Sequence, residues 1–318
     1  MDLVIALAGL AILLVAGDLL VRGAVSLSLR LGVPALIVGL TVVAFGTSAP
    51  ELLISVQAAL EDSPGIALGN VVGSNIANIL LVLGAPALIS TLDGRASDTV
   101  KSYALMMVAT AVFIGLCWLG PLDWPHGLVL LGILAYMLAD ALRDGRAARA
   151  AGPQTEPAEI EGVETSAAEA PAWRIALFLA IGLVGLPLGA QLLIEGARNL
   201  ALAFGISESA IGLTLVAVGT SLPELATTVM AALRREADVA LGNVIGSNIF
   251  NLAAVMGITV VIADLPIPAE FLTRDLWVML GVALVLAPFV TGRLAMGRIV
   301  GALFLAAYVA YAGVALAA

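Results

Sequence analysis

The chain is short of charge and of the residues that most enzymes use for chemistry. Charged residues make up 12% of its 318 residues, whereas a soluble domain carries about 25%. A single cysteine, Cys117, cannot form a disulfide within the chain. A single histidine, His126, cannot build a polyhistidine metal site, and no nucleophile motif lies near it for a Ser-His or Cys-His pair. These shortages argue against a soluble enzyme.

What the chain has instead is hydrophobic residues, which make up 61% of it. Apolar runs of about 20 residues recur, and each can cross a bilayer as one helix. We expect an all-α integral membrane protein with ten transmembrane helices. They are expected at 3–30, 34–60, 66–90, 101–119, 126–142, 174–204, 207–233, 239–262, 275–291 and 295–316. No basic cluster or cleavage site marks a signal peptide, so the first span is expected to begin at residue 3.

The stretch 143–173 differs from the rest of the chain. It is rich in Ala, Pro, Glu and Thr and has no apolar period, which predicts a disordered acidic linker. A calcium-binding role for its glutamates is disfavoured because EF-hand spacing is absent. The linker separates a first five-helix repeat at 1–142 from a second at 174–318.

Basic residues gather on the side of the membrane that would hold the linker. They are Arg30, Arg95, Lys101, Arg143, Arg146, Arg149, Arg174, Arg234, Arg235, Arg293 and Arg298. Lys and Arg are enriched on the cytoplasmic side of membrane proteins. We therefore expect a multi-pass protein of the cell (inner) membrane, with the linker in the cytoplasm and both termini on the outer side.

Two segments of the chain repeat each other. Residues 39–84 align with 212–257 without a gap, at a constant offset of 173, and 27 of the 46 positions are identical. Because each half has an odd number of spans, the second half must enter the membrane from the opposite side. This predicts two inverted repeats. Transporters built that way bind their substrates near the membrane midplane, where the repeats meet.

Each repeat places one glutamate, Glu51 or Glu224, inside an expected span. A carboxylate in mid-membrane is costly and indicates a functional site, the more so at equivalent positions of a repeat. Pro50 and Pro223 come directly before them. Proline has no N–H, so we expect a kink that frees a backbone carbonyl toward a polar interior.

Two further charges, Asp18 and Arg22, lie within the first expected span. They are four residues apart and share one helix face. The aligned positions of the second half hold Gln191 and Glu195, so this charge pattern is not repeated. We expect an ion pair or an interfacial location there rather than part of an ion pathway.

Polar oxygens accompany the two glutamates. Hydroxyls precede each glutamate, and the next span of each half carries a stripe at i, i+4 and i+8: Asn70, Ser74 and Asn78, and then Asn243, Ser247 and Asn251. Taken alone, such stripes commonly serve only helix packing. With two carboxylates they offer oxygen ligands, which hard cations such as Ca²⁺ and Na⁺ prefer, and no soft ligand for copper or zinc accompanies them.

These motifs resemble the two alpha repeats of the calcium/cation antiporter superfamily, on its Na⁺/Ca²⁺ exchanger branch. They read GTSAPEL at 46–52 with GNVVGSNIAN at 69–78, and GTSLPEL at 219–225 with GNVIGSNIFN at 242–251. The ten-helix layout and the central loop fit as well. The resemblance implies a cation site made of Glu51, Glu224, Thr47, Ser48, Thr220, Ser221, Ala44, Ala217, Ser74, Asn78, Ser247 and Asn251.

The resemblance also implies roles for these residues. Glu51 and Glu224 would be central bidentate ligands shared by Ca²⁺ and Na⁺, and Ala44 and Ala217 would offer backbone carbonyls. Several relatives, including potassium-dependent ones, carry Asp where this chain has Asn251, which weakens the case for a K⁺ requirement. The proton-coupled branch typically has a glutamate in a GNxxE-type motif. Neither GN motif here is followed by Glu, which favours sodium coupling.

We therefore expect a secondary active transporter that exchanges Na⁺ for Ca²⁺ by alternating access, with Ca²⁺/H⁺ antiport as the alternative. An intramembrane protease would need a histidine partner or paired aspartates, so no enzyme activity is expected. A non-transporting Ca²⁺ sensor is disfavoured by the duplicated site. No cofactor is expected beyond the transported ions. The expected partners are Ca²⁺, Na⁺ and the lipid bilayer; no nucleic acid or protein partner is indicated.

Overall fold

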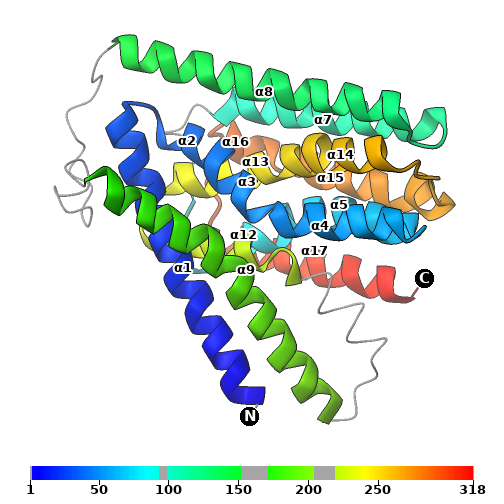
Figure 1. Cartoon of the computed structure of the whole chain (residues 1–318), viewed down its shortest axis with the longest axis horizontal. Helices are drawn as coiled ribbons and strands as arrows, with labels where there is room; N and C mark the ends of the chain where they lie inside the picture. Colours follow the sequence, from blue (N-terminus) through cyan, green and yellow to red (C-terminus); the bar gives the residue numbers. More distant parts are fainter. Residues whose placement is uncertain (1, 93–98, 152–170, 204–218, 318) are drawn as a thin grey trace.

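The computed structural model describes residues 2–92, 99–151, 171–203 and 219–317, and its regular elements there are helices (Figure 1). In these ranges the only β pairing is two isolated bridges, Leu92–Met296 and Leu122–Leu265. Eight helices are long and apolar enough to cross a membrane, or nine if a bent pair counts as one span. The all-helical, multi-pass membrane fold expected from the sequence is thus confirmed.

The helices follow one another in the order expected from the apolar runs, with short π-helical segments (η) between some of them. The first half holds α1 (Asp2–Leu31), α2 (Ala35–Val38), η1 (Gly39–Val43), α3 (Ala44–Thr47), α4 (Ala49–Leu60), α5 (Pro64–Ala77), η2 (Asn78–Val82), α6 (Gly84–Ile89), α7 (Thr99–Leu119) and α8 (Trp124–Ala151). The second half holds α9 (Ala172–Ala203), α12 (Leu222–Leu233), α13 (Ala237–Phe250), η5 (Asn251–Val255), α14 (Met256–Ile262), η6 (Phe271–Asp275), α15 (Leu276–Val285), α16 (Ala287–Val290) and α17 (Arg298–Ala317).

Two expectations need comment at the middle of the chain. Helix α8 continues to Ala151, nine residues past the expected boundary at 142, because the stretch that follows is mostly Ala and Arg, which are strong helix formers and outweigh Asp144 and Gly145. The rest of the expected linker, at 152–170, lies outside the described residues. The span expected at 207–233 is described only from Gly219 onward, where α12 forms its second part.

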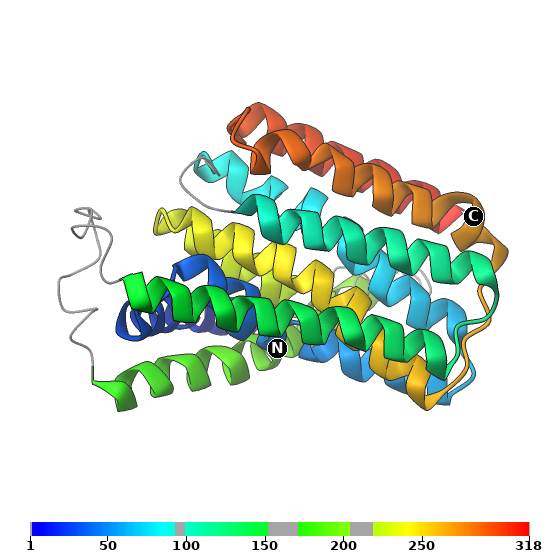
Figure 2. The same ribbon diagram turned by 90° about the horizontal axis from the view of Figure 1, so that it is seen from above.

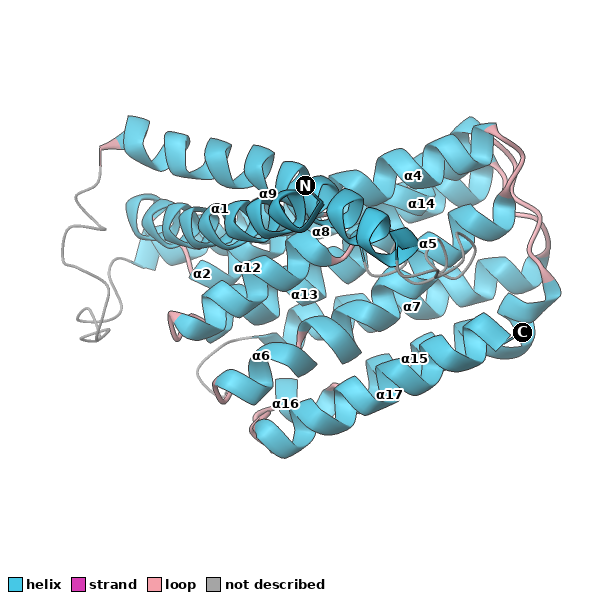
Figure 3. Cartoon of the chain, turned by 90° about the horizontal axis from the view of Figure 1, so that it is seen from below, coloured by secondary structure: helices cyan, strands magenta, loops and turns pink. Residues whose placement is uncertain are grey.

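Helices α1 and α9 pack against each other and lean across the other helices (Figures 1 and 3). Glycines allow their backbones to approach closely. A Cβ on Gly189 would lie 2.8 Å from the backbone N of Leu13 and 3.0 Å from the carbonyl oxygen of Gly9. Small residues at such an interface let two membrane helices meet at backbone distance.

The most enclosed helices carry the repeated motifs. In the most apolar window of Ala237–Ile262, 83% of the residues are buried, and in that of Pro64–Ile89 the share is 72%. Helices α7 and α8 and the α15–α17 group lie around them (Figure 2). The motif-bearing helices therefore form the centre of the bundle, where side chains are shielded from lipid.

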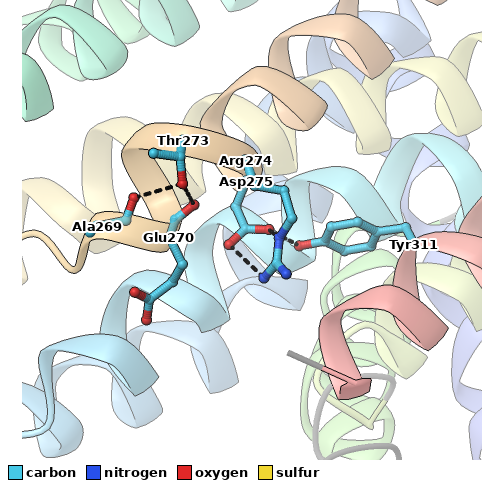
Figure 4. A network of polar contacts seen from close by, with 6 residues as sticks. All are labelled: Ala269, Glu270, Thr273, Arg274, Asp275 and Tyr311. Carbon is cyan, nitrogen blue, oxygen red and sulfur yellow. Dashed lines mark hydrogen bonds and ion pairs between the residues drawn. The ribbon is translucent and has the colours of Figure 1, made fainter.

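A polar cluster ties the beginning of the α15 region to α17 (Figure 4). The Arg274 guanidinium donates to the buried Asp275 carboxylate at 2.9 Å, and the Tyr311 hydroxyl reaches the same carboxylate at 3.4 Å. The Thr273 hydroxyl donates to the carbonyl oxygen of Ala269 at 3.0 Å. The negative charge of the buried Asp275 is therefore compensated by the neighbouring Arg274, as a buried carboxylate requires.

Candidate cation site

Each glutamate lies three residues after a serine that has nearly the same backbone conformation in both repeats. Helices α3 and α4 belong to a broken pair bent by 44°, as the sequence predicted from Pro50. Ser48, at the bend, has φ −83° and ψ 5°, and Ser221 has nearly the same values, −84° and 3°. Glu51 and Glu224 then lie in the first turn of the following helix. The positive end of a helix dipole favours negative charge at that place.

Both carboxylates are buried, as expected. Glu51 is 1% exposed and Glu224 is 0% exposed. One oxygen of each, Oε2, has no hydrogen-bond partner. The two carboxylates are close enough to repel each other electrostatically. Two buried carboxyl groups with free oxygens must be neutralised, either by protons or by a bound cation.

Residues from both halves surround Glu224. The Ser48 hydroxyl donates to its Oε1 at 3.4 Å, and the hydroxyls of Thr47 and Ser247 also face the carboxylate. Thr47 in turn contacts the side-chain oxygen of Asn243 at 3.4 Å and the hydroxyl of Ser247 at 3.5 Å. The two repeated motifs thus meet at one place.

A pair of asparagines holds the glutamate-bearing helices in position. The Asn70 amide donates to the Ser55 hydroxyl at 2.9 Å and to the backbone carbonyl of Glu51 at 3.0 Å. At the positions 173 residues later, the Asn243 amide donates to the Thr228 hydroxyl at 3.1 Å. Because these amide groups are used for helix contacts, we assign them a supporting role.

A second set of asparagines pairs across the two halves. The Asn78 amide donates to Oδ1 of Asn248 at 3.0 Å, and the Asn251 amide donates to Oδ1 of Asn75 at 3.2 Å. Asn78 and Asn251 each begin a π-helical segment, and each keeps a buried Oδ1 without a partner. Single-turn π-helices occur frequently at functional sites.

Sequence reasoning missed the two acceptors of this arrangement, Asn75 and Asn248. Behind them, the Asn75 amide contacts the sulfur of Met279 at 3.7 Å, and the Asn248 amide contacts that of Met106 at 3.6 Å. The available signal was their place inside the GSN triplet that both repeats share. They lie off the i, i+4, i+8 stripe, so periodicity alone did not select them.

Most of the expected site residues are buried. Those that the structure describes as buried are Ala44, Thr47, Ser48, Glu51, Ser74, Asn78, Thr220, Ser221, Glu224, Ser247 and Asn251. The remaining expected residue, Ala217, lies outside the described residues. The Ala44 carbonyl already accepts hydrogen bonds from the Ser48 amide at 3.1 Å and the Thr47 hydroxyl at 3.3 Å.

The buried oxygens without a partner gather in these motifs. Five of the seven among the described residues belong to them: Oε2 of Glu51, Oε2 of Glu224, Oδ1 of Asn78, Oδ1 of Asn251 and Oγ of Ser221; the other two are on Asp123 and Glu236. Each such atom costs about 1–3 kcal/mol when it is buried unpaired. Within the described ranges, no three His, Cys, Asp or Glu side chains form a metal-binding group. The available ligands are oxygens of two carboxylates, amides and a hydroxyl, which suit a hard cation.

The ion pair expected on α1 is present and has an additional member. Nε of Arg22 lies 2.9 Å from Asp18, and Nε of Arg234 donates to the same carboxylate at 2.6 Å. Arg234 comes directly after α12, so this cluster joins α1 to the helix that bears Glu224. Sequence spacing predicted the Arg22 partner, but the Arg234 partner depends on the tertiary structure.

Comparison with known proteins agrees with this geometry. The family described as sodium/calcium exchanger protein matches residues 1–140 and 174–317. The chain is 38% identical to the "Putative antiporter CaxA" of Alkalimonas amylolytica, over 96% of this chain and 95% of that protein. It is 30% identical to the "Sodium/calcium exchanger MaX1" of Methanosarcina acetivorans, over 98% and 97%.

A solved structure of the sodium-calcium exchanger NCX_Mj, soaked with Na⁺ and Ca²⁺, has the same fold. It aligns with a TM-score of 0.79 and 33% identity, over 97% of this chain and 96% of that one. These relatives are transporters rather than enzymes. The family matches nearly the whole chain apart from the linker region. The chain therefore belongs to the sodium/calcium exchanger family.

Proposed function

We propose that this protein exchanges Na⁺ for Ca²⁺ at a single central site, by alternating access. The observation that carries the proposal is the pair of buried carboxylates, Glu51 and Glu224, each with an unpartnered Oε2. In the proposed site the other ligands are Thr47, Ser48, Thr220, Ser221, Ala44, Ala217, Ser74, Asn78, Ser247 and Asn251. Ca²⁺ takes about 6–8 oxygen ligands, which this set can supply.

The charge of the site explains why transport would be an exchange. An empty site carries two carboxylates in an apolar bundle, and an unpaired buried charge costs several kcal/mol. One Ca²⁺ would neutralise both Glu51 and Glu224, and so would Na⁺ ions bound together. The ion-loaded protein can then convert between its inward-facing and outward-facing states. The empty protein converts slowly, because its carboxylates would be buried without a compensating charge.

The moving parts of this mechanism would be α1 and α9. They pack on each other through glycines, α1 contacts α12, and α9 contacts α3. These contacts put one long helix against each of the bent, ligand-bearing segments. Sliding of the α1–α9 pair over the central helices would open the site to one side of the membrane and close it to the other.

We further propose ten spans in two inverted five-helix repeats. Support comes from polar contacts that recur at the offset of 173, such as Asn70–Ser55 and Asn243–Thr228. With the basic residues counted as above, the region between α8 and α9 would be cytoplasmic and both termini would lie outside an inner membrane.

Sodium coupling is supported by the absence of a glutamate after either GN motif and by relatives whose names include sodium, such as MaX1. The alternative is Ca²⁺/H⁺ antiport. The test uses the full-length protein in vesicles and radioactive Ca²⁺. Vesicles loaded with Na⁺ and diluted into Na⁺-free buffer should take up Ca²⁺, with or without K⁺. Uptake driven by a pH gradient in the absence of Na⁺ would contradict sodium coupling and support the alternative.

A further inference from the structure

A pocket of about 930 Å³ lies away from the cation site, between α2, α7, α8 and α13. None of the residues assigned to the cation site lines it. Its volume is at the upper end of the range for ligand pockets, roughly 300–1,000 Å³. Most of its wall is apolar. Its charged residues are Lys101 in the first turn of α7, Asp238 in the first turn of α13, and Asp140 and Asp144 in the second half of α8.

The pocket has the length and polarity of one leaflet of a membrane. Its lining on α8 runs from Asp144 to Val129, which are fifteen helical steps or about 22 Å apart. Asp144 lies at the charged end of the pocket, and Val129 lies at its apolar end. Half of a bilayer's hydrocarbon core is about 15 Å thick, so the apolar end reaches the membrane interior.

The side of the pocket is open to lipid. Val108 is 53% exposed, Val129 is 48% exposed and Tyr136 is 55% exposed, and all three line the pocket. In a membrane these surfaces face hydrocarbon. Water would find few polar partners along such a wall. An acyl chain is therefore the occupant that its apolar part favours.

The charged residues at one end of the pocket determine which lipid headgroup can bind there. Nζ of Lys101 lies 2.7 Å from Asp140 and 2.8 Å from Asp144, and Asp238 lines the same pocket. Two carboxylates thus contact one ammonium group, and this excess of negative charge disfavours an anionic headgroup. A primary ammonium can donate hydrogen bonds to these carboxylates. A lysine ammonium has three donors, so Lys101 keeps one for a phosphate oxygen.

We propose that this pocket binds one phosphatidylethanolamine molecule, with its ammonium near Asp140 and Asp144, its phosphate at Lys101 and one acyl chain along α8. The bound lipid fills the space between α8 and the α2–α13 pair. This inference concerns a lipid site and does not depend on which ion drives exchange.

A cavity-filling substitution tests the acyl-chain part. Gly132 lines the pocket, and a Cβ added there would meet no atom within 4 Å. Gly132→Leu should fill the pocket without a clash. Gly115→Leu is the matched control, because Gly115 on α7 also has open space but lies outside the pocket. The full-length protein is placed in vesicles of equal phosphatidylethanolamine, phosphatidylcholine and phosphatidylglycerol. It is then extracted, and retained lipid is counted by native mass spectrometry.

The parent and Gly115→Leu should retain one phosphatidylethanolamine, and Gly132→Leu should lower its retention by about tenfold. A double variant, Asp140→Asn with Asp144→Asn, should still retain one lipid but lose the preference for phosphatidylethanolamine over phosphatidylcholine. Preferential retention of phosphatidylglycerol by the parent would overturn the proposal. So would unchanged retention in a Gly132→Leu protein that melts like the parent. If Gly132→Leu does not fold, an unchanged headgroup preference in the aspartate variant overturns it.

Discussion

The side-chain amide of Asn78 donates a hydrogen bond to the side-chain oxygen of Asn248 at 3.0 Å. The two residues belong to different repeats, and Asn251 and Asn75 form the reciprocal bond at 3.2 Å. In each bond the donor, Asn78 or Asn251, uses its amide NH₂ group. The Oδ1 atom of the same donor residue stays buried without a partner. The pairing therefore leaves one unpartnered buried oxygen in each half, and a shared cation site could use both.

The first prediction concerns these free oxygens. Asn78→Ala or Asn251→Ala should raise the Na⁺ concentration for half-maximal exchange by about tenfold, because each removes one oxygen ligand worth on the order of 1.4 kcal/mol. The measurement is Ca²⁺ flux against Na⁺ concentration in vesicles. Gln57→Ala is the control, since this amide is exposed and bonds to Glu61. An unchanged Na⁺ dependence in both asparagine variants would remove these residues from the site.

The second prediction concerns the ion pair between α1 and α12. Asp18 bonds to both Arg22 and Arg234, and Arg234 is the more buried partner, at 25% side-chain exposure against 48%. A double-mutant cycle with Asp18→Asn and Arg234→Gln should give a coupling of about 1 kcal/mol, and the Arg22 cycle should give less. Thermal melting in detergent measures it, at about 2–4 °C per kcal/mol. A larger coupling for Arg22 would contradict the assignment.

The third prediction concerns Glu236, in the turn before α13. Burial and the nearby charge of Asp238 raise the pKa of this carboxyl above its ordinary value, 4.5, and its Oε1 has no partner. The folded protein therefore holds this proton to a higher pH than the unfolded chain does. By linkage, the stabilising contribution is complete at low pH and is lost as pH rises from about 4.5 through the raised pKa.

Glu236→Gln should remove this loss, so its melting temperature should fall less than that of the parent between about pH 4.5 and pH 7.5. Melting curves at intervals across this range measure the difference. The control is Glu61→Gln, because Glu61 is exposed at the end of α4. A Glu236→Gln protein with the pH profile of the parent would show that this carboxyl does not contribute.

Much of the proposed site could be predicted because individual residue types indicate its main features. A glutamate inside an apolar run has few explanations, and Pro50 predicts a bend in any helix. The identical GSN triplets and the offset of 173 indicated that two segments act together. Residue type and spacing were sufficient for these features because each depends on local chemistry.

Other features depended on how the helices meet. The partners of Asn78 and Asp18 are Asn248 and Arg234, which lie 170 and 216 residues away. The π-helical segments that begin at Asn78 and Asn251 leave no mark in apolar periodicity. The extension of α8 to Ala151 was missed because polar composition suggested a linker, although the helix-forming residues there favoured a helix.

The central claim is that Glu51 and Glu224 form one site for the exchanged cation. The most direct measurement is Na⁺-driven uptake of radioactive Ca²⁺ into vesicles with the parent, Glu51→Gln and Glu224→Gln, and with Glu61→Gln as a control for loss of a carboxylate outside the site. Matched protein amounts and melting curves confirm that each variant is folded. The account predicts that Glu51→Gln and Glu224→Gln each reduce uptake to background, whereas Glu61→Gln leaves it unchanged. Uptake at the parental rate in either site variant would contradict it.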